Sequence, residues 1–208
     1  MQAEVTKANS RPAISIVIPV FNAENTLDEC IESLKAQTFD DWEAVCVNDG
    51  SHDGSLEKLQ RFAEEDDRIR VFTQENAGPS AARNAALDAA RGEIVMFLDC
   101  DDWYEPNACE TVHDAFCNGE VDIMAFGAIC VPESAAPKHV RDLLSPCDEI
   151  IAGFTPDVLF SKHAQPYIAR IAARRAFLEA HHVRFATDIK LAEDTAFLFE
   201  AYPHARKT

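Results

Sequence analysis

Strand-like and helix-like segments alternate through the first part of the chain, and this alternation constrains the fold more than any other feature of the sequence. Short apolar, β-branched runs are typical of strands, and the segments between them carry apolar residues at helical spacing. The predicted strands cover 14–20, 42–47, 69–72, 94–98 and 121–126, and the predicted helices cover 24–36, 55–65, 79–91 and 105–117. This order implies βαβ crossovers and an α/β fold with a mostly parallel sheet flanked by helices.

The second part of the sequence follows a different pattern. Several prolines predict a long irregular connection that begins at about residue 130. Helical spacing then recurs, interrupted by a strand-like segment at 183–185. The predicted helices of this part cover 155–163, 174–181 and 193–201.

The two patterns divide the chain into three predicted parts. These are an N-terminal tail over 1–12, an α/β half over 13–127 and a smaller, mostly helical region over 128–208. Because a helix-like segment runs almost to Thr208, we expect the last region to be cut short at its C-terminus.

The composition argues against several classes of partner. The chain has 19 Lys and Arg residues against 36 Asp and Glu, a formal net charge of −17, and its basic residues are scattered. Nucleic acids and anionic membrane surfaces would therefore be repelled. The seven cysteines form no Cys-x-x-Cys pair, which is typical of free thiols in a reducing compartment. The sequence shows neither a signal peptide nor a membrane-spanning segment. The expected location is therefore the cytoplasm, which includes the inner face of the membrane.

Polar residues follow four of the predicted strands at the point where each strand ends. They are grouped at 21–22, 48–51, 74–76 and 99–102. In open α/β sheets, ligands bind beyond the carboxyl ends of the strands. Because these ends lie at one edge of a parallel sheet, we expect the four groups to form one binding site.

The acidic group at 99–102 is the most informative stretch of the sequence. Residues two apart lie on the same side of a strand, so Asp99 and Asp101 can converge. Closely spaced carboxylates repel each other unless a cation neutralises them. Hard oxygen ligands suit Mg²⁺ or Mn²⁺, which share their remaining positions with substrate phosphates. An acidic turn that only hydrates the edge of the sheet is the alternative.

Two further segments bring binding groups to the same edge. In 48–55, Gly50 permits a tight turn and a close approach of the ligand, and Asp49 can accept a hydrogen bond from a nucleobase N–H. In 76–84, a helix N-terminus and Arg83 both favour anions. For Arg83, an ion pair with one of the many acidic residues is the alternative.

Four segments, in this order, resemble the motifs of the family 2 glycosyltransferases, which have the Rossmann-like GT-A fold. They are ISIVIPVFN (14–22), VNDGSHDGS (47–55), NAGPSAARN (76–84) and GEIVMFLDCDDW (92–103). The similarity covers about residues 13–125 and continues more weakly to about 203. Each motif alone is modest, whereas four in order are very specific.

The resemblance implies a nucleotide-sugar site across the strand ends, most often for a UDP-sugar. By this analogy Asp49 contacts the base, and the Asp-x-Asp element contacts the ribose and holds Mn²⁺ or Mg²⁺ through Asp99 and Asp101. The net charge of −17 makes such a cation more necessary for an anionic donor. The residues expected to bind the nucleotide-sugar are Pro19, Phe21, Asn22, Glu24, Asp49, Gly50, Asn76, Gly78, Arg83, Asp99 and Cys100.

Members of this family are mostly inverting, and a carboxylate of a late Glu-Asp pair acts as their general base. Here the matching pair is Glu193-Asp194, and we assign the base to Asp194 with Glu193 in reserve. A pair of acids that only stabilises a helix N-terminus is the alternative. The implied acceptor is a glycan or a lipid-linked oligosaccharide of cell-surface polysaccharide synthesis.

Two departures from the family pattern and three competing functions complete the sequence reading. Cys100 stands where Ser or Ala is more familiar, and the Gln-x-x-Arg-Trp element of processive members is absent, which weakens a processive synthase reading. A non-catalytic nucleotide-sugar-binding module is one competing function. A nucleotidyltransferase is another, although the segment 20–24 is not its Gly- and Arg-rich phosphate loop. The lack of Gly-x-Gly-x-x-Gly after the first strand disfavours a dinucleotide oxidoreductase.

Overall fold

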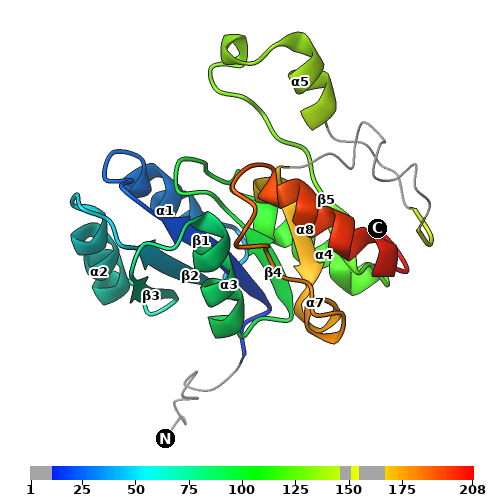
Figure 1. Cartoon of the computed structure of the whole chain (residues 1–208), viewed down its shortest axis with the longest axis horizontal. Coiled ribbons are helices and arrows are strands. Elements are labelled where there is room, and N and C mark those ends of the chain that lie inside the picture. The colour runs from blue at the N-terminus through cyan, green and yellow to red at the C-terminus, as the bar shows by residue number, and fades with distance from the viewer. Residues whose placement is uncertain (1–10, 146–150, 155–166) are drawn as a thin grey trace, which may run out of the picture.

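The computed structural model describes residues 11–145, 151–154 and 167–208, and the chain folds around one six-stranded sheet (Figure 1). The strand order is β3-β2-β1-β4-β6-β5. The strands are β1 (Ile14–Val20), β2 (Trp42–Asp49), β3 (Ile69–Gln74), β4 (Ile94–Phe97), β5 (Ile123–Ala125) and β6 (Ile171–Arg174). The α-helices are α1 (Leu27–Lys35), α2 (Ser55–Glu65), α3 (Pro79–Ala89), α4 (Ala108–Asn118), α5 (Lys138–Leu144), α7 (Arg175–Ala180) and α8 (Glu193–Ala201). Short 3₁₀ turns are η1 (Glu133–Ala135), η2 (Ile168–Arg170) and η3 (Tyr202–His204).

The sheet is parallel over four of its strands and antiparallel at β6. β1 pairs in parallel with both β2 and β4, and β2 pairs in parallel with β3. β6 runs antiparallel between β4 and β5. The predicted α/β fold with a mostly parallel sheet is therefore confirmed, but β6 was not predicted. Its sequence IAAR is short and Ala-rich, so it lacks the run of β-branched residues that marks a strand.

Successive side chains of the central strands point to opposite faces of the sheet and build two cores. On one face, Ile16 and Ile18 of β1 pack with α1, α2 and α4, through buried residues such as Leu27 and Phe62. On the other face, Val17 packs with apolar residues of α3, α7 and α8. A strand covered on both faces is mostly apolar, which explains why β1 is apolar except for Ser15.

Some predicted elements differ from the structure. The first helix begins at Leu27 and not at residue 24, because the residues before it form a braced loop described below. The segment 183–185 is irregular and not a strand. It is nevertheless held in place, because the backbone of Phe185 exchanges two hydrogen bonds with the Asn84 side chain. The helix predicted over 155–163 lies outside the described residues.

The region after β5 contains more regular structure than predicted. The short helix α5 and the turn η1 interrupt the connection that was expected to be irregular, and α5 stands away from the sheet in Figure 1. β6 then returns the chain to the sheet built by the first half. The boundary at residue 127 stays a prediction. In the described ranges, no helix combines the length and the apolar character needed to cross a membrane.

Candidate active site

A cavity of about 410 Å³ opens at the carboxyl ends of β1, β2 and β4. This is the edge at which an open α/β sheet places its ligands. The cavity is lined by Pro19, Val20, Phe21, Asp49, Asn76, Gly78, Pro79, Arg83, Asp99, Cys100 and Asp101. The structure thus brings together most of the predicted site residues and adds Val20 and Pro79. Asn22, Glu24 and Gly50 were also predicted to bind the ligand but do not line the cavity.

Asp49 is buried at the end of β2, and its carboxylate holds the turn that leads into α3. One oxygen accepts hydrogen bonds from Gln74 Nε2 at 2.7 Å and from the Ala77 N–H at 2.9 Å. The other oxygen accepts the Gly78 N–H at 2.8 Å. In this structure the Asp49 carboxylate therefore fixes the turn beside the cavity. Its contact with a nucleobase stays a prediction.

Gly50 allows the loop after β2 to lie against the turn before α3. Its φ of +70° is a backbone conformation that residues with a side chain rarely adopt. A Cβ atom added there would lie 2.9 Å from the backbone nitrogen of Asn76. The Asn76 side chain in turn donates a hydrogen bond to the backbone oxygen of Asp49 at 2.9 Å. Gly50 therefore lies against Asn76, which lines the cavity, and does not line the cavity itself.

The loop between β1 and α1 is braced by the loop between β2 and α2. Asn22 has a φ of +51°, which Asn tolerates better than most residues. Its side-chain oxygen accepts the His52 N–H at 2.8 Å, and its own N–H donates to Ser51 Oγ at 3.0 Å. These bonds fix the backbone next to Phe21, whose ring is exposed at the cavity.

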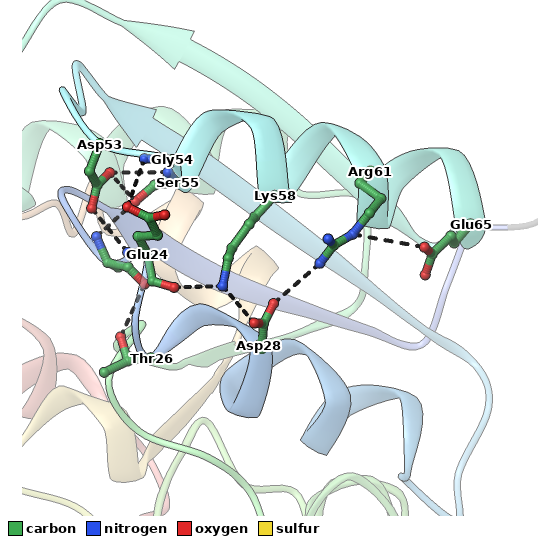
Figure 2. Close-up of polar contacts among 10 residues, drawn as sticks. Glu24, Thr26, Asp28, Asp53, Gly54, Ser55, Lys58, Arg61 and Glu65 are labelled. Atoms are coloured by element: carbon green, nitrogen blue, oxygen red, sulfur yellow. Dashed lines mark hydrogen bonds and ion pairs between the residues drawn. The ribbon is translucent and has the colours of Figure 1, made fainter.

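Glu24 strengthens the same brace (Figure 2). Its carboxylate accepts the Gly54 N–H at 3.2 Å, and its own N–H donates to Asp53 Oδ2 at 3.1 Å. Lys58 of α2 donates to the backbone oxygen of Glu24 at 2.7 Å and pairs with Asp28 of α1 at 2.5 Å. In this structure Glu24 and Asn22 therefore join two loops beside the cavity, and their contact with a donor stays a prediction.

Cys100 is partly buried and packs against the core, although it also lines the cavity. Burial raises the pKa of this thiol to about 11, although a hydrogen bond from the Phe21 backbone opposes the shift. The thiol is therefore neutral near pH 7. A neutral thiol does not suit a hard cation, so Cys100 is not a suitable metal ligand.

Asp99 and Asp101 are the residues that could hold a divalent cation. Both line the cavity, and both offer hard carboxylate oxygens. Among the described residues, no cluster of three or more potential His, Cys, Asp or Glu ligands is found. The donor set therefore fits Mg²⁺ or Mn²⁺ bound through one or two carboxylates, with the remaining positions taken by substrate phosphate and water.

Arg83 joins the end of β4 to the start of α8. Its Nη2 atom lies 2.7 Å from Asp99 Oδ1. Its Nη1 atom lies 3.1 Å from Glu193 Oε1 and 3.5 Å from Asp194 Oδ1. The alternative of an ion pair is thus realised three times, while Arg83 also lines the cavity. Glu193 and Asp194, the two candidates for the general base, therefore contact the same guanidinium as the predicted metal ligand Asp99.

Asp194 sits in the first turn of α8 with both carboxylate oxygens engaged. Oδ2 accepts the Ile168 N–H at 3.0 Å, and Oδ1 faces Arg83. Burial raises the pKa of Asp194 above its ordinary value, and the charge of Arg83 opposes this rise. Two acids in a first helical turn also interact favourably with the helix dipole, so this alternative holds beside the predicted catalytic role.

Asn84 is a site-supporting residue to which the sequence reasoning gave no role. It follows Arg83 on α3, and its amide exchanges hydrogen bonds of 2.8 and 2.9 Å with the backbone of Phe185. The Phe185 ring stacks on Phe197 of α8, with ring centroids 4.3 Å apart. The signal was present in the motif NAGPSAARN, but the partner lies 101 positions away in sequence and could not be read from it.

Comparison with known proteins gives consistent matches over most of the chain. The model of the family described as glycosyl transferase family 2 matches residues 15–180. The uncharacterized glycosyltransferase EpsJ of Bacillus subtilis is 33% identical over 201 residues, which are 94% of this chain and 58% of that protein. The poly(ribitol-phosphate) beta-glucosyltransferase of Bacillus spizizenii is 31% identical over 93% of this chain and 30% of that protein. The chain therefore spans somewhat more than half the length of EpsJ and less than a third of the glucosyltransferase.

The fold also matches a solved structure. Residues 1–349 of S. aureus TarS superpose with a TM-score of 0.78 and 25% sequence identity, over 92% of this chain and 56% of that one. TarS has also been solved in complex with UDP and with UDP-GlcNAc, and these structures match with the same TM-score at 24% identity.

Proposed function

This chain belongs to glycosyl transferase family 2, and from that premise we propose that it binds a nucleoside-diphosphate sugar and transfers the sugar to an acceptor hydroxyl. The observation that carries the proposal is the meeting of Asp99 and Asp194 at Arg83, on the wall of the cavity. A donor-side carboxylate and a candidate base are thereby brought to one place from distant parts of the chain.

The donor is proposed to lie across the carboxyl ends of β1, β2 and β4. Pro19 and Phe21 would frame the nucleobase on one side, with Asp49 and Asn76 below it. An aromatic ring offers a base a stacking surface, and the exposed ring of Phe21 supplies one. UDP is the first nucleotide to test, because TarS, which shares this fold, has been solved with it.

Asp99 and Asp101 are proposed to hold Mn²⁺ or Mg²⁺ together with the diphosphate. When bound, such a cation neutralises the charge that develops on the departing nucleoside diphosphate. The requirement is strong in a chain with a formal net charge of −17. Arg83 is a poor substitute for the cation, because its positive charge is already shared by Asp99, Glu193 and Asp194.

Asp194 is proposed as the general base of an inverting transfer, with Glu193 as the reserve candidate. The acceptor hydroxyl would lose its proton to Asp194 as its oxygen bonds to the anomeric carbon, while the bond from that carbon to the diphosphate oxygen breaks. The raised pKa of Asp194 supports this role, because a carboxylate in a buried site is a stronger base than one in water.

The acceptor is proposed to be a glycan or a lipid-linked oligosaccharide of cell-surface polysaccharide synthesis. The similarity to a poly(ribitol-phosphate) beta-glucosyltransferase supports a polymer acceptor of this kind. The same similarity makes UDP-glucose a reasonable donor to include beside UDP-GlcNAc.

The test is a calorimetric titration with UDP and then GDP, each with and without Mn²⁺, followed by turnover of UDP-sugars. We expect UDP to bind only in the presence of Mn²⁺ and UDP to be released from at least one UDP-sugar. Binding without any turnover or hydrolysis of the donor would favour a non-catalytic binding module. No nucleotide binding under any metal condition would contradict the proposed donor site.

A further inference from the structure

A single guanidinium connects carboxylates that come from two distant parts of the chain. Arg83 on α3 pairs with Asp99, 16 positions further on, and with Glu193 and Asp194, 110 and 111 positions further on. The two terminal nitrogens contact different acids. Nη2 faces Asp99, whereas Nη1 faces the two acids of α8. The planar fork of an arginine can bridge separate acids in this way, whereas a lysine offers one point charge.

Arg83 is buried more deeply than the acids that it joins. Its side chain is 6% exposed, against 33% for Asp99 and about 20% for each acid of α8. The guanidinium lies over the ring of Phe185, with its central carbon 5.3 Å from the ring centroid. A diphosphate in the cavity would have to compete with these carboxylates for the terminal nitrogens of Arg83.

Arg83 supplies the positive charge that offsets part of the negative charge of the three carboxylates at this bridge. In every ion pair that the structure records for Asp99, Glu193 or Asp194 within the described residues, Arg83 is the cation. Three carboxylates without that cation would repel each other. The repulsion would act between the end of β4 and the first turn of α8, which Arg83 now draws together.

We propose that Arg83 is a positioning residue that sets the separation between the donor-side carboxylate Asp99 and the base Asp194. This inference rests on the proposed function and deepens it. It differs from the expectation drawn from the sequence, in which Arg83 binds the donor. Asn84 supports the same task, because it fixes the segment at Phe185 that packs under α8.

The test compares Arg83→Lys and Arg83→Met with a matched control, Arg184→Lys. Arg184 also joins α3 to the segment at 183–185, through Asp88 at 3.1 Å, but it touches none of the three carboxylates. Binding of UDP with Mn²⁺ is measured by calorimetry, and UDP release from UDP-GlcNAc and UDP-glucose gives kcat and KM. Circular dichroism checks the fold of each variant.

We expect kcat to fall about tenfold in Arg83→Lys and about 100-fold in Arg83→Met, because a displacement of about 1 Å at a reacting centre has effects of this size. Binding of UDP with Mn²⁺ should stay within about threefold of wild type, because Arg83 is not a donor ligand in this proposal. Arg184→Lys should leave both quantities unchanged. If Arg83→Met does not fold, Arg83→Lys decides the question.

Two results would overturn the proposal. One is a kcat within about threefold of wild type in Arg83→Lys. The other is an equal loss of kcat and of UDP affinity, which would make Arg83 a donor ligand. If the wild type neither binds UDP nor releases it, the proposed function fails by itself. Hydrogen exchange of the ligand-free chain then tests the bridge, since α8 should lose protection in Arg83→Lys and not in Arg184→Lys, and unchanged exchange refutes it.

Discussion

At the scale of single residues, the carboxylate of Asp49 determines the shape of the turn that precedes α3. Three donors converge on it, from Gln74, Ala77 and Gly78. A carboxylate is acceptor-only, so it can satisfy all three donors at once. An amide in the same place would point an NH₂ group either at the donors of Gln74 and Ala77 or at the Gly78 N–H.

We therefore expect Asp49→Asn to lower both the free energy of unfolding and the affinity for UDP. Loss of hydrogen bonds to a buried charged group costs about 1–3 kcal/mol. Urea unfolding and calorimetry with UDP and Mn²⁺ measure the two effects. Gln74→Ala is the control, because it removes one donor and leaves the two backbone bonds in place. Unchanged stability in Asp49→Asn would contradict the role assigned to this carboxylate.

Asp102 should make stability depend on pH in an unusual direction for an acid. Burial, and then the charges of Asp101 and Asp99, raise the pKa of Asp102 to about 6. The unfolded chain ionises such a group at about 3.9. The folded state therefore holds the proton more tightly, and this stabilisation is complete below about pH 4 and is lost as the pH rises through about 6.

Asp102→Asn, which stays neutral, should accordingly gain stability relative to wild type as the pH rises from about 4 to about 7. Urea unfolding of both proteins in EDTA at several pH values measures the difference. EDTA removes cations that would otherwise bind beside this residue. A difference that does not change with pH would show that the neighbouring carboxylates do not act on Asp102 as the structure indicates.

At the scale of elements, a buried ion cluster ties β1, β2 and β3 together. Glu43 of β2 is almost fully buried and accepts hydrogen bonds from Ser15 Oγ at 2.7 Å and from the Arg91 N–H at 2.8 Å. Arg70 and Arg91 pair with its second oxygen at 3.0 and 2.7 Å. Burial works to raise the pKa of Glu43, but the hydrogen bonds from Ser15 and Arg91 outweigh it, and the pKa is lowered.

Glu43→Gln should lower the free energy of unfolding by about 1–3 kcal/mol at pH 7, because it weakens the charge-assisted hydrogen bonds of a buried carboxylate, while the partly exposed Arg70 and Arg91 can be hydrated. A lowered pKa means that this stabilisation is present above about pH 4.5 and is lost as the pH falls through the folded-state value. The deficit of the variant should therefore shrink below pH 4. Urea unfolding measures it, and the exposed Glu93 provides the control Glu93→Gln, which should cost little.

The elements that the sequence predicted well are those that carry their own signal. β1 is rich in β-branched residues and α3 begins at Pro79, so local chemistry sets them, although α3 ends at Ala89 and not, as predicted, directly before Gly92. β6 has no such signal, because its strand conformation depends on pairing with β4 and β5. The opposite error concerns the segment 183–185, which was predicted to be a strand. Its apolar residues are buried against Asn84 and α8, but the segment does not join the sheet.

The same distinction applies to the site. The residues at the strand ends could be predicted because the topology of a parallel sheet brings them to one edge. The contacts that join them could not be predicted, because they depend on pairs such as Arg83 with Asp194 that lie far apart in sequence. Asn22 and Glu24 belong to the recognised motif, but only the structure places them in a brace between two loops.

At the scale of the whole molecule, the proposed donor site and the proposed base come from different parts of the chain. The cavity is built by residues at or after the carboxyl ends of β1, β2, β3 and β4, all from the first half of the chain. Asp194 comes from α8, which lies on one face of the sheet and packs through Phe197 on Phe97 and Phe185. If the proposed function is correct, donor binding and turnover are therefore separable by substitution.

Asp101→Ala and Asp194→Asn should separate them in opposite ways. Asp101 is exposed at the cavity and has no cation near it in the recorded ion pairs of the described residues, so its loss removes a proposed metal ligand without leaving a buried charge unpaired. The binding of UDP that depends on Mn²⁺ should therefore be abolished in this variant. Asp194→Asn keeps the shape of the side chain and can still accept the Ile168 N–H, but it cannot take a proton.

Asp194→Asn should therefore bind UDP with Mn²⁺ as the wild type does, while kcat falls by about 10²–10⁴-fold, the usual contribution of a general base. Glu193→Gln is its matched control, because Glu193 lies on the same guanidinium and differs only in the role assigned to it. Retained turnover in Asp194→Asn together with a loss in Glu193→Gln would move the base to Glu193. Retained turnover in both would exclude the first turn of α8 from the chemistry, and the two acids would then serve to stabilise the helix N-terminus and to neutralise Arg83.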